Sequence, residues 1–251
     1  MDASEPIDDV GSGMAGDTVV QTRDLRKSYR QGGLDVCALA GVSFSVSSGE
    51  FTALVGPSGS GKSTLLNLLG ALDTPSGGSV MVNGEDLSKL SRAALAQFRL
   101  SRLGFVFQDY NLLPVLSALE NVEYVLLLQG VSGLERRRRA ERALEQVDLG
   151  AMGHRRPGEL SGGQQQRVAV ARAIVSEPML ILADEPTANL DSETGESLLD
   201  LMCQLNKRLG ATFIISTHDP MVMSHVRRII RLKDGHLLED SNSAPSANCL
   251  A

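Results

Sequence analysis

The residues with the clearest chemical pattern form a glycine-rich loop between a predicted strand and a predicted helix. Gly56, Gly61, Lys62 and Ser63 match GxxxxGK[ST], a phosphate-binding motif that requires this strand-loop-helix context. Backbone N–H groups surround the phosphates, the lysine brings a positive charge to the β and γ groups, and the serine hydroxyl ligates Mg²⁺. The alternative is a glycine turn without a ligand. The predicted phosphate-binding residues are Gly56, Pro57, Ser58, Gly59, Ser60, Gly61, Lys62, Ser63 and Thr64.

Two adjacent acids end a second predicted strand, MLILADE. Ligands of open α/β sheets gather at the carboxyl ends of the strands. There Asp184 would bind Mg²⁺, directly or through water, and Glu185 would polarise the water that attacks a γ-phosphate. Taken alone, such a pair is more often a helix cap or a solvated loop. The phosphate loop in the same chain favours the catalytic interpretation.

The guanine-reading pattern NKxD of GTPases is not satisfied, since Asn206 and Lys207 are followed by Arg208 and Leu209. The two motifs alone do not distinguish phosphate transfer to water from transfer to a substrate. A kinase-type enzyme with a phosphate loop therefore stays possible at this point.

A second helix start suited to an anion occurs in LSGGQQQRVAVARAIV, residues 160–175. Ser161 and two glycines precede a helix that buries Val168, Ala171 and Val175 on one face. A single nucleotide site needs only one such start. The second start therefore calls for another explanation.

The string LSGGQ resembles the signature motif of the ATP-binding cassette family. In that family the signature contacts the γ-phosphate of an ATP molecule that is bound to the phosphate loop of a second copy. The resemblance implies a head-to-tail homodimer in which each chain supplies half of two shared sites. It covers the chain from about Val19 to Glu239. The implied signature residues are Ser161, Gly162, Gly163 and Gln164.

Further roles follow only from this resemblance. Tyr29 would stack on adenine, His218 would contact the γ-phosphate, and Asp191 would lie in the loop that links the two sites. Gln108 would be the lid glutamine that touches Mg²⁺ and couples to a partner. The alternatives are a core or surface tyrosine, a polar residue at a strand end and a structural loop histidine. The implied catalytic residues are Glu185, His218, Gln108 and Lys62, and the implied Mg²⁺ ligands are Ser63, Gln108 and Asp184.

The elements that position these residues alternate in the manner of a parallel sheet covered by helices. We predict an α/β fold, a P-loop NTPase (RecA-like) core with an antiparallel β subdomain and a helical subdomain at about 109–160. Hairpins are predicted at QGG (31–33) and at Asp234-Gly235. Core strands are predicted at 51–56, 104–108, 179–185 and 211–218, and core helices after the phosphate loop, at 160–175 and at 193–209.

Length and composition favour one domain. The chain has 251 residues, of which 42% are hydrophobic, so we expect a nucleotide-binding domain at 19–240, a flexible acidic tail at 1–18 and a flexible tail at 241–251. The net charge of -6 argues against nucleic acid as a partner. Arg136 to Arg139 occur together with Glu135 and Glu141 on a predicted helix and are interpreted as a solvated face rather than a nucleic-acid patch.

No apolar run approaches the roughly 20 residues needed to span a bilayer. A single phosphate loop and a single signature, without long coiled coils, exclude the ribosome-associated and chromosome-associated cassette classes. The resemblance then implies the ATPase of a transporter, peripheral on the cytoplasmic face of the inner membrane and bound to separate integral-membrane subunits.

The segments GFVFQDYNLLPVLSALENV and ADEPTANLD resemble the lipoprotein-releasing, macrolide-exporting and cell-division ATPases. Many of these have glycine where this chain has Ala188. The resemblance implies ATP-driven export, extraction or mechanotransmission. An importer ATPase for amino acids or ions and a cell-division signalling ATPase are the alternatives.

Overall fold

The computed structural model describes residues 18–242. The strand β1 begins at Thr18 and the strand β10 ends at Asn242, so these strands extend slightly into the segments predicted as tails. The rest of both predicted tails lies outside the described residues.

A six-stranded sheet forms the centre of the molecule, in the order β10-β9-β3-β8-β7-β6. The five strands from β9 to β6 are parallel, and β10 adds an antiparallel edge. Because parallel strands need crossover connections, their carboxyl ends meet at one edge of the sheet. The strands are β3 (Phe51–Val55), β6 (Leu103–Val106), β7 (Leu180–Asp184), β8 (Thr212–Thr217), β9 (Arg228–Lys233) and β10 (His236–Asn242).

A four-stranded antiparallel sheet, in the order β2-β1-β4-β5, forms the predicted β subdomain. Gly32 and Gly33 have positive φ and make the turn of the predicted hairpin. Leu25 on β1 and Ile214 on β8 belong to one buried cluster that joins the two sheets. The strands are β1 (Thr18–Gln31), β2 (Leu34–Ser47), β4 (Gly77–Val82) and β5 (Glu85–Asp86).

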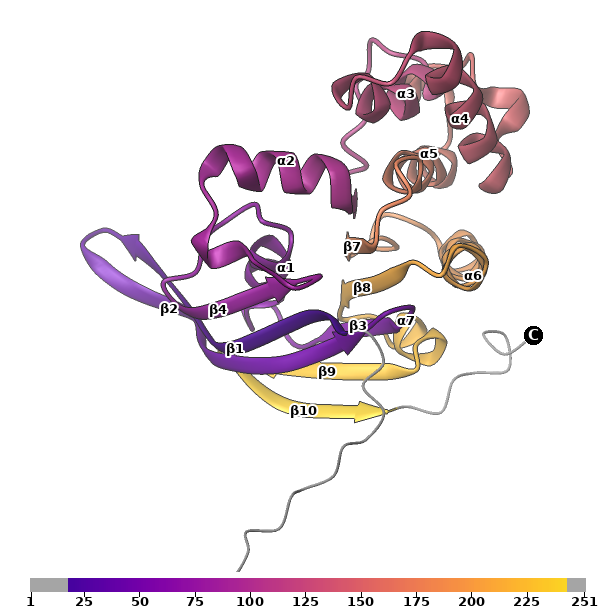
Figure 1. Ribbon diagram of the computed structural model, residues 1–251. Helices are drawn as coiled ribbons and strands as arrows, with labels where there is room; N and C mark the ends of the chain where they lie inside the picture. Colours follow the sequence, from indigo (N-terminus) through magenta and orange to yellow (C-terminus); the bar gives the residue numbers. More distant parts are fainter. Residues whose placement is uncertain (1–17, 243–251) are drawn as a thin grey trace, which may run out of the picture.

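Helices α3, α4 and α5 pack together at one end of the molecule (Figure 1), and α5 also contacts β6. The sequence patterns yielded no prediction for α2, which Ser91 caps by accepting a hydrogen bond from the Ala94 N–H group. The helices are α1 (Lys62–Leu69), α2 (Arg92–Arg102), α3 (Ala118–Leu128), α4 (Gly133–Gln146), α5 (Gly162–Ile174), α6 (Ser192–Leu209) and α7 (Pro220–His225). Single 3₁₀ turns occur at η1 (Leu87–Lys89), η2 (Gly150–Met152) and η3 (Pro157–Glu159).

The arginine run on α4 is a solvated face only in part. Arg137 and Arg138 are exposed and pair with acids on the same helix, at 3.0 and 2.7 Å. Arg139 instead donates to the Val175 carbonyl oxygen at 2.8 Å, and Arg136 lies 3.8 Å from Glu123 on α3. The prediction of one solvated face is therefore wrong for these two residues, because α4 packs against α3 and α5.

Candidate active site

The phosphate loop, residues 56–64, connects the end of β3 to the start of α1. Its backbone has positive φ at Gly56 (+156°) and at Gly61 (+103°). A Cβ atom at Gly61 would lie 2.6 Å from the carbonyl oxygen of Ala38, and one at Gly56 would collide with the carbonyl oxygen of Leu232. The loop therefore folds tightly against β2 and β9, which excludes a side chain at both glycines.

Lys62 is the first residue of α1, and its side chain turns back over the loop. Its Nζ atom donates to the carbonyl oxygens of Gly56 (2.7 Å) and Pro57 (3.2 Å). The residue is only 8% exposed. Neutral carbonyl groups do not cancel the charge of an ammonium group, so Lys62 can still attract an anionic ligand.

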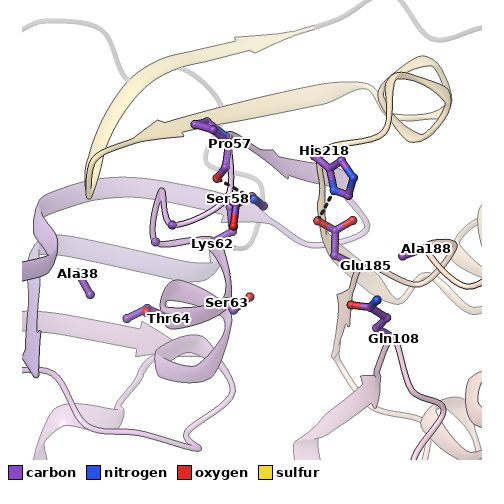
Figure 2. A pocket seen from close by; sticks show the side chains of 12 residues that line it. Ala38, Pro57, Ser58, Lys62, Ser63, Thr64, Gln108, Glu185, Ala188 and His218 are labelled. Atoms are coloured by element: carbon purple, nitrogen blue, oxygen red, sulfur yellow. Dashed lines mark hydrogen bonds and ion pairs between the residues drawn. The ribbon is translucent and has the colours of Figure 1, made fainter. Parts of the chain in front are cut away.

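A cavity of about 590 Å³ opens beside the loop. The phosphate loop forms one wall, and Glu185, Gln108 and His218 face it from the other side (Figure 2). Gly56 and Ser60 are not among the lining residues, and Ser60 is 1% exposed. A cavity of this size is within the usual range for a small-molecule ligand. The lining residues are Ala38, Pro57, Ser58, Gly59, Gly61, Lys62, Ser63, Thr64, Gln108, Glu185, Ala188 and His218.

Asp184 ends β7, directly opposite Ser216 on β8. The Ser63 hydroxyl donates to Oδ1 of Asp184 at 3.3 Å. The Ser216 hydroxyl donates to the same oxygen at shorter range, and Ser216 is fully buried. Two hydroxyl groups therefore hold the carboxylate at the carboxyl edge of the sheet, next to the phosphate loop.

Glu185 has a left-handed backbone, with φ of +46°. Its N–H group donates to the Ser216 carbonyl oxygen at 3.0 Å. Its Oε1 atom lies 2.9 Å from Nδ1 of His218, and both side chains line the cavity. Left-handed backbone is uncommon for residues other than glycine and persists where surrounding contacts determine it. Here it turns the chain sharply after β7, so that Asp184 and Glu185 are both held at the site.

Gln108 follows β6 and is held by Asn189, a residue of the loop after Glu185. Its Nε2 atom donates to Oδ1 of Asn189 at 3.4 Å, and Nδ2 of Asn189 donates to the Gln108 carbonyl oxygen at 3.1 Å. The loop after β6 and the loop after β7 are thus joined by reciprocal hydrogen bonds.

The donor set at this edge fits Mg²⁺. Ser63, Asp184 and Gln108 offer hydroxyl, carboxylate and amide oxygens, which are hard ligands. Within residues 18–242, no group of three or more His, Cys, Asp or Glu could hold a metal ion. These residues therefore fit an ion held by one carboxylate, neutral protein oxygens and substrate phosphates, rather than an ion in a cage of protein ligands.

Tyr29 on β1 lies beside the cavity, although it is not one of the lining residues. Its hydroxyl donates to Oδ2 of Asp73 at 2.9 Å, and Nζ of Lys27 lies 4.8 Å from the ring centroid. Burial and the hydrogen bond to Asp73 raise the pKa of Tyr29, and a hydrogen bond with Thr64 opposes this shift. The Tyr29 hydroxyl is therefore close to Thr64, a residue that lines the cavity.

The signature segment begins α5 with a capping box. Oγ of Ser161 accepts from the Gln164 N–H group at 3.3 Å, and Oε1 of Gln164 accepts from the Ser161 N–H group at 3.0 Å. Among the described residues that line the phosphate-loop cavity, none belongs to residues 161–164. The chain thus does not bring its two anion-binding helix starts together in one cavity.

Asp191 is the N-cap of α6, and Thr194 in the first turn of this helix lies next to the signature. Its carboxylate accepts from the N–H group and the hydroxyl of Thr194, at 3.0 and 2.7 Å, which lowers its pKa. A Cβ atom at Gly163 would collide with Cγ2 of Thr194. The signature and the Asp191 loop therefore pack against one another, away from the lining of the cavity.

Sequence reasoning missed three residues at this site: Ser216, Asn189 and Ala38. Ser216 had a weak signal, because it is a polar residue in an apolar strand just before His218. Ala38 and Asn189 gave no local signal, because Ala38 contacts the phosphate loop from β2 and Asn189 bonds to Gln108 in the loop after β6.

A parallel sheet with a phosphate loop, an Asp-Glu pair and a histidine at the carboxyl ends of its strands defines the molecule as a P-loop nucleotide hydrolase. Residues 39–188 match the family model described as ABC transporter. The chain belongs to this family: it is an ABC transporter ATP-binding protein, an ATP hydrolase similar to LolD and to the ATPase part of MacB.

Curated relatives span most of the chain. An uncharacterized ABC transporter ATP-binding protein of Thermotoga maritima is 50% identical over 219 residues, which are 87% of this chain and 93% of that protein. The lipoprotein-releasing system ATP-binding protein LolD of Pseudomonas fluorescens is 47% identical over 90% of this chain and 99% of its own length. The macrolide export ATP-binding/permease protein MacB of Marinobacter nauticus is 47% identical over 91% of this chain. The chain spans only 36% of that MacB protein.

Solved structures agree with the fold. One is a dimeric structure of the ATP-binding cassette MJ0796, described as a post-hydrolysis state bound to ADP and Pi. Its TM-score to this chain is 0.82 and its sequence is 43% identical, over 89% of this chain and 98% of the MJ0796 chain. The cbiO1 protein of Clostridium perfringens, described as part of the ABC transporter complex cbiONQ, has the same TM-score with 30% identity, over 90% of this chain and 89% of that chain. The predicted fold class is confirmed.

Proposed function

We propose that two copies of this chain close around two ATP molecules and that this closure moves integral-membrane subunits in separate chains. The observation that supports it most is the position of Ser161 and the signature glycines, outside the lining of the chain's own phosphate-loop cavity. A helix start that suits an anion but is remote from that cavity can complete the site of a second copy. The related MJ0796 cassette is described as a dimer.

The chemistry at each site follows from the residues around the cavity. The loop N–H groups and Lys62 hold the phosphates. Ser63, Asp184 and Gln108 would hold Mg²⁺, which when bound would neutralise part of the phosphate charge. Glu185 accepts the proton of the attacking water. His218 orients the Glu185 carboxylate through their 2.9 Å contact and faces the γ-phosphate.

Tyr29 supports the adenine ring, since its hydroxyl is close to Thr64, which lines the cavity, and the residue is 37% exposed. Asp191 and the signature segment contact the second copy. In this arrangement ATP binding closes the dimer, and hydrolysis removes the γ-phosphate contacts that hold it closed. Closure is then the step that does mechanical work.

We further propose lipoprotein release or macrolide or peptide efflux as the class of transport, because relatives named for lipoprotein release and for macrolide export are each 47% identical to this chain. The chain would then be peripheral, on the cytoplasmic face of the inner membrane, where its partners cross the bilayer. Between Thr18 and Asn242, no helix is long and apolar enough to cross a membrane.

The test is to express the tagged Glu185→Gln protein, extract it in mild detergent with ATP, and identify the copurifying chains by mass spectrometry. A partner with few spanning helices and a large extracytoplasmic domain is the expected result. A many-helix permease without such a domain would instead indicate an importer. A cell-wall hydrolase regulator would indicate signalling, and ribosomal or DNA-bound proteins alone would contradict the transporter proposal.

A further inference from the structure

Gln166 on α5 joins the two segments that carry the proposed catalytic side chains. Its Nε2 atom donates to the carbonyl oxygen of Phe107 at 3.2 Å and to that of Pro186 at 2.7 Å. Phe107 directly precedes Gln108, and Pro186 directly follows Glu185. The side-chain amide of Gln166 therefore ties both loops to α5, the helix that the signature serine caps.

The burial of this amide has a cost. Gln166 is fully buried, and its Oε1 atom has no hydrogen-bond partner among the described residues. A buried acceptor without a partner lowers the stability of the fold relative to a satisfied one. An apolar side chain of similar size would avoid that cost, so the two donated hydrogen bonds are what the glutamine contributes at this position.

A second residue of α5 holds the same loop further along. Arg172 donates to the carbonyl oxygens of Tyr110 and Asn111, at 2.8 and 2.5 Å. Both of these residues have left-handed backbones, with φ of +59° and +50°. Such conformations cost energy unless their surroundings determine them. The loop that carries Gln108 is therefore shaped by α5 at two points, first by Gln166 and then by Arg172.

We propose that Gln166 is a positioning residue for ATP hydrolysis, which sets the relative placement of Gln108 and Glu185 and links both to the signature helix. This inference rests on the proposed function, in which Glu185 is the base. When the partner's ATP engages the helix start at Ser161, any shift of α5 is passed through Gln166 to both loops. The placement of the catalytic residues thus depends on the same helix whose start contacts the second copy.

The experiment compares Gln166→Met with Gln165→Met in steady-state ATP hydrolysis by the full chain. Gln165 is the neighbouring glutamine on α5, and its Nε2 atom donates only to the Leu160 carbonyl oxygen, at 3.1 Å. We expect Gln166→Met to lower kcat by roughly 10- to 100-fold with KM for ATP changed less than about 2-fold, because small displacements of catalytic groups lower the rate of the chemical step. Gln165→Met should retain the parental kcat.

Gln166→Glu covers the case in which the methionine variant does not fold. Burial favours the neutral form of a glutamic acid at this position. The neutral acid keeps the shape and can donate to only one of the two carbonyl oxygens, so its kcat should fall below the parental value. Parental kcat in Gln166→Glu, or equal kcat in Gln166→Met and Gln165→Met, would overturn the proposal.

A double-mutant cycle with Gln108→Ala separates positioning from general destabilisation. If Gln166 acts through Gln108, the loss of kcat caused by Gln166→Met should be smaller when Gln108 is already alanine. Losses that multiply independently would show that Gln166 does not act through Gln108 and would contradict the proposed placement of Gln108 by this amide. Full hydrolysis by Glu185→Gln in the same assay would instead contradict the proposed function, so the two failures can be told apart.

Discussion

Nδ1 of His218 lies 2.9 Å from Oε1 of Glu185, and these residues follow two neighbouring parallel strands, β8 and β7. The pair lies at the carboxyl edge of the sheet, opposite the phosphate loop. The imidazole can therefore fix the direction of the carboxylate at the wall of the cavity. This geometry supports the proposal that Glu185 activates the attacking water.

Glu185→Gln should retain ATP binding and lose hydrolysis. The amide keeps the size of the side chain and leaves Asp184 and Ser63 unchanged, but it cannot accept the proton. A general base contributes about 10²- to 10⁴-fold to the rate, so kcat should fall at least 100-fold. Size-exclusion chromatography should show a dimer that persists with ATP. Hydrolysis at the parental rate would exclude Glu185 as the base.

Ser161→Arg should abolish hydrolysis and leave ATP binding by the monomer intact. The new side chain obstructs the start of α5, which lies outside the lining of the chain's own cavity. Ser132→Arg is a matched control, since Ser132 is the exposed N-cap of α4 and makes no side-chain cap bond. Equilibrium binding of a fluorescent ATP analogue and steady-state hydrolysis distinguish the two effects. Weakened ATP binding by the Ser161→Arg monomer would contradict a site completed in trans.

Ser216→Ala should raise the Mg²⁺ concentration needed for half-maximal hydrolysis several-fold. The buried Ser216 hydroxyl donates to the Asp184 carboxylate, and its loss leaves the direction of that carboxylate less well determined. Removal of this buried hydrogen bond should also lower stability by about 1–3 kcal/mol, measured by urea denaturation. Ser224→Ala, an exposed serine on α7, should change neither quantity. An unchanged Mg²⁺ requirement in Ser216→Ala would show that Ser63 alone orients Asp184.

Gly61→Ala should prevent ATP binding. The added methyl group would lie 2.6 Å from the Ala38 carbonyl oxygen at a residue with φ of +103°, so the phosphate loop would have to move. Gly84→Ala, at a turn where a Cβ atom meets nothing within 4 Å, carries similar backbone strain without that collision. We expect both variants to lose on the order of 1–3 kcal/mol of stability, and Gly61→Ala alone to lose ATP affinity. Equal ATP affinities would show that the loop tolerates the methyl group.

Much of this architecture could be predicted from local patterns. Apolar runs and glycine turns indicated the parallel core, both hairpins and the helical region, and these agree with the observed strands and helices. Helix α2 was missed because its buried residues, Leu95 and Phe98, are too few to show a clear helical period. The prediction of a solvated face was wrong for Arg136 and Arg139 for a related reason. A mixture of acidic and basic residues does not reveal which face of a helix is packed.

The sequence by itself determined the two helix starts suited to anions and the acidic strand end, because each depends on contiguous residues whose backbone geometry is local. The tertiary structure alone decided which of them meet. It placed Ser63 beside Asp184, 121 residues further along the chain, and joined Gln166 to Phe107 across 59 residues. It also left the signature outside the lining of the cavity. The order of parallel strands and the packing of α5 against them produce these relationships, and strand order depends on long-range contacts that no local spacing encodes.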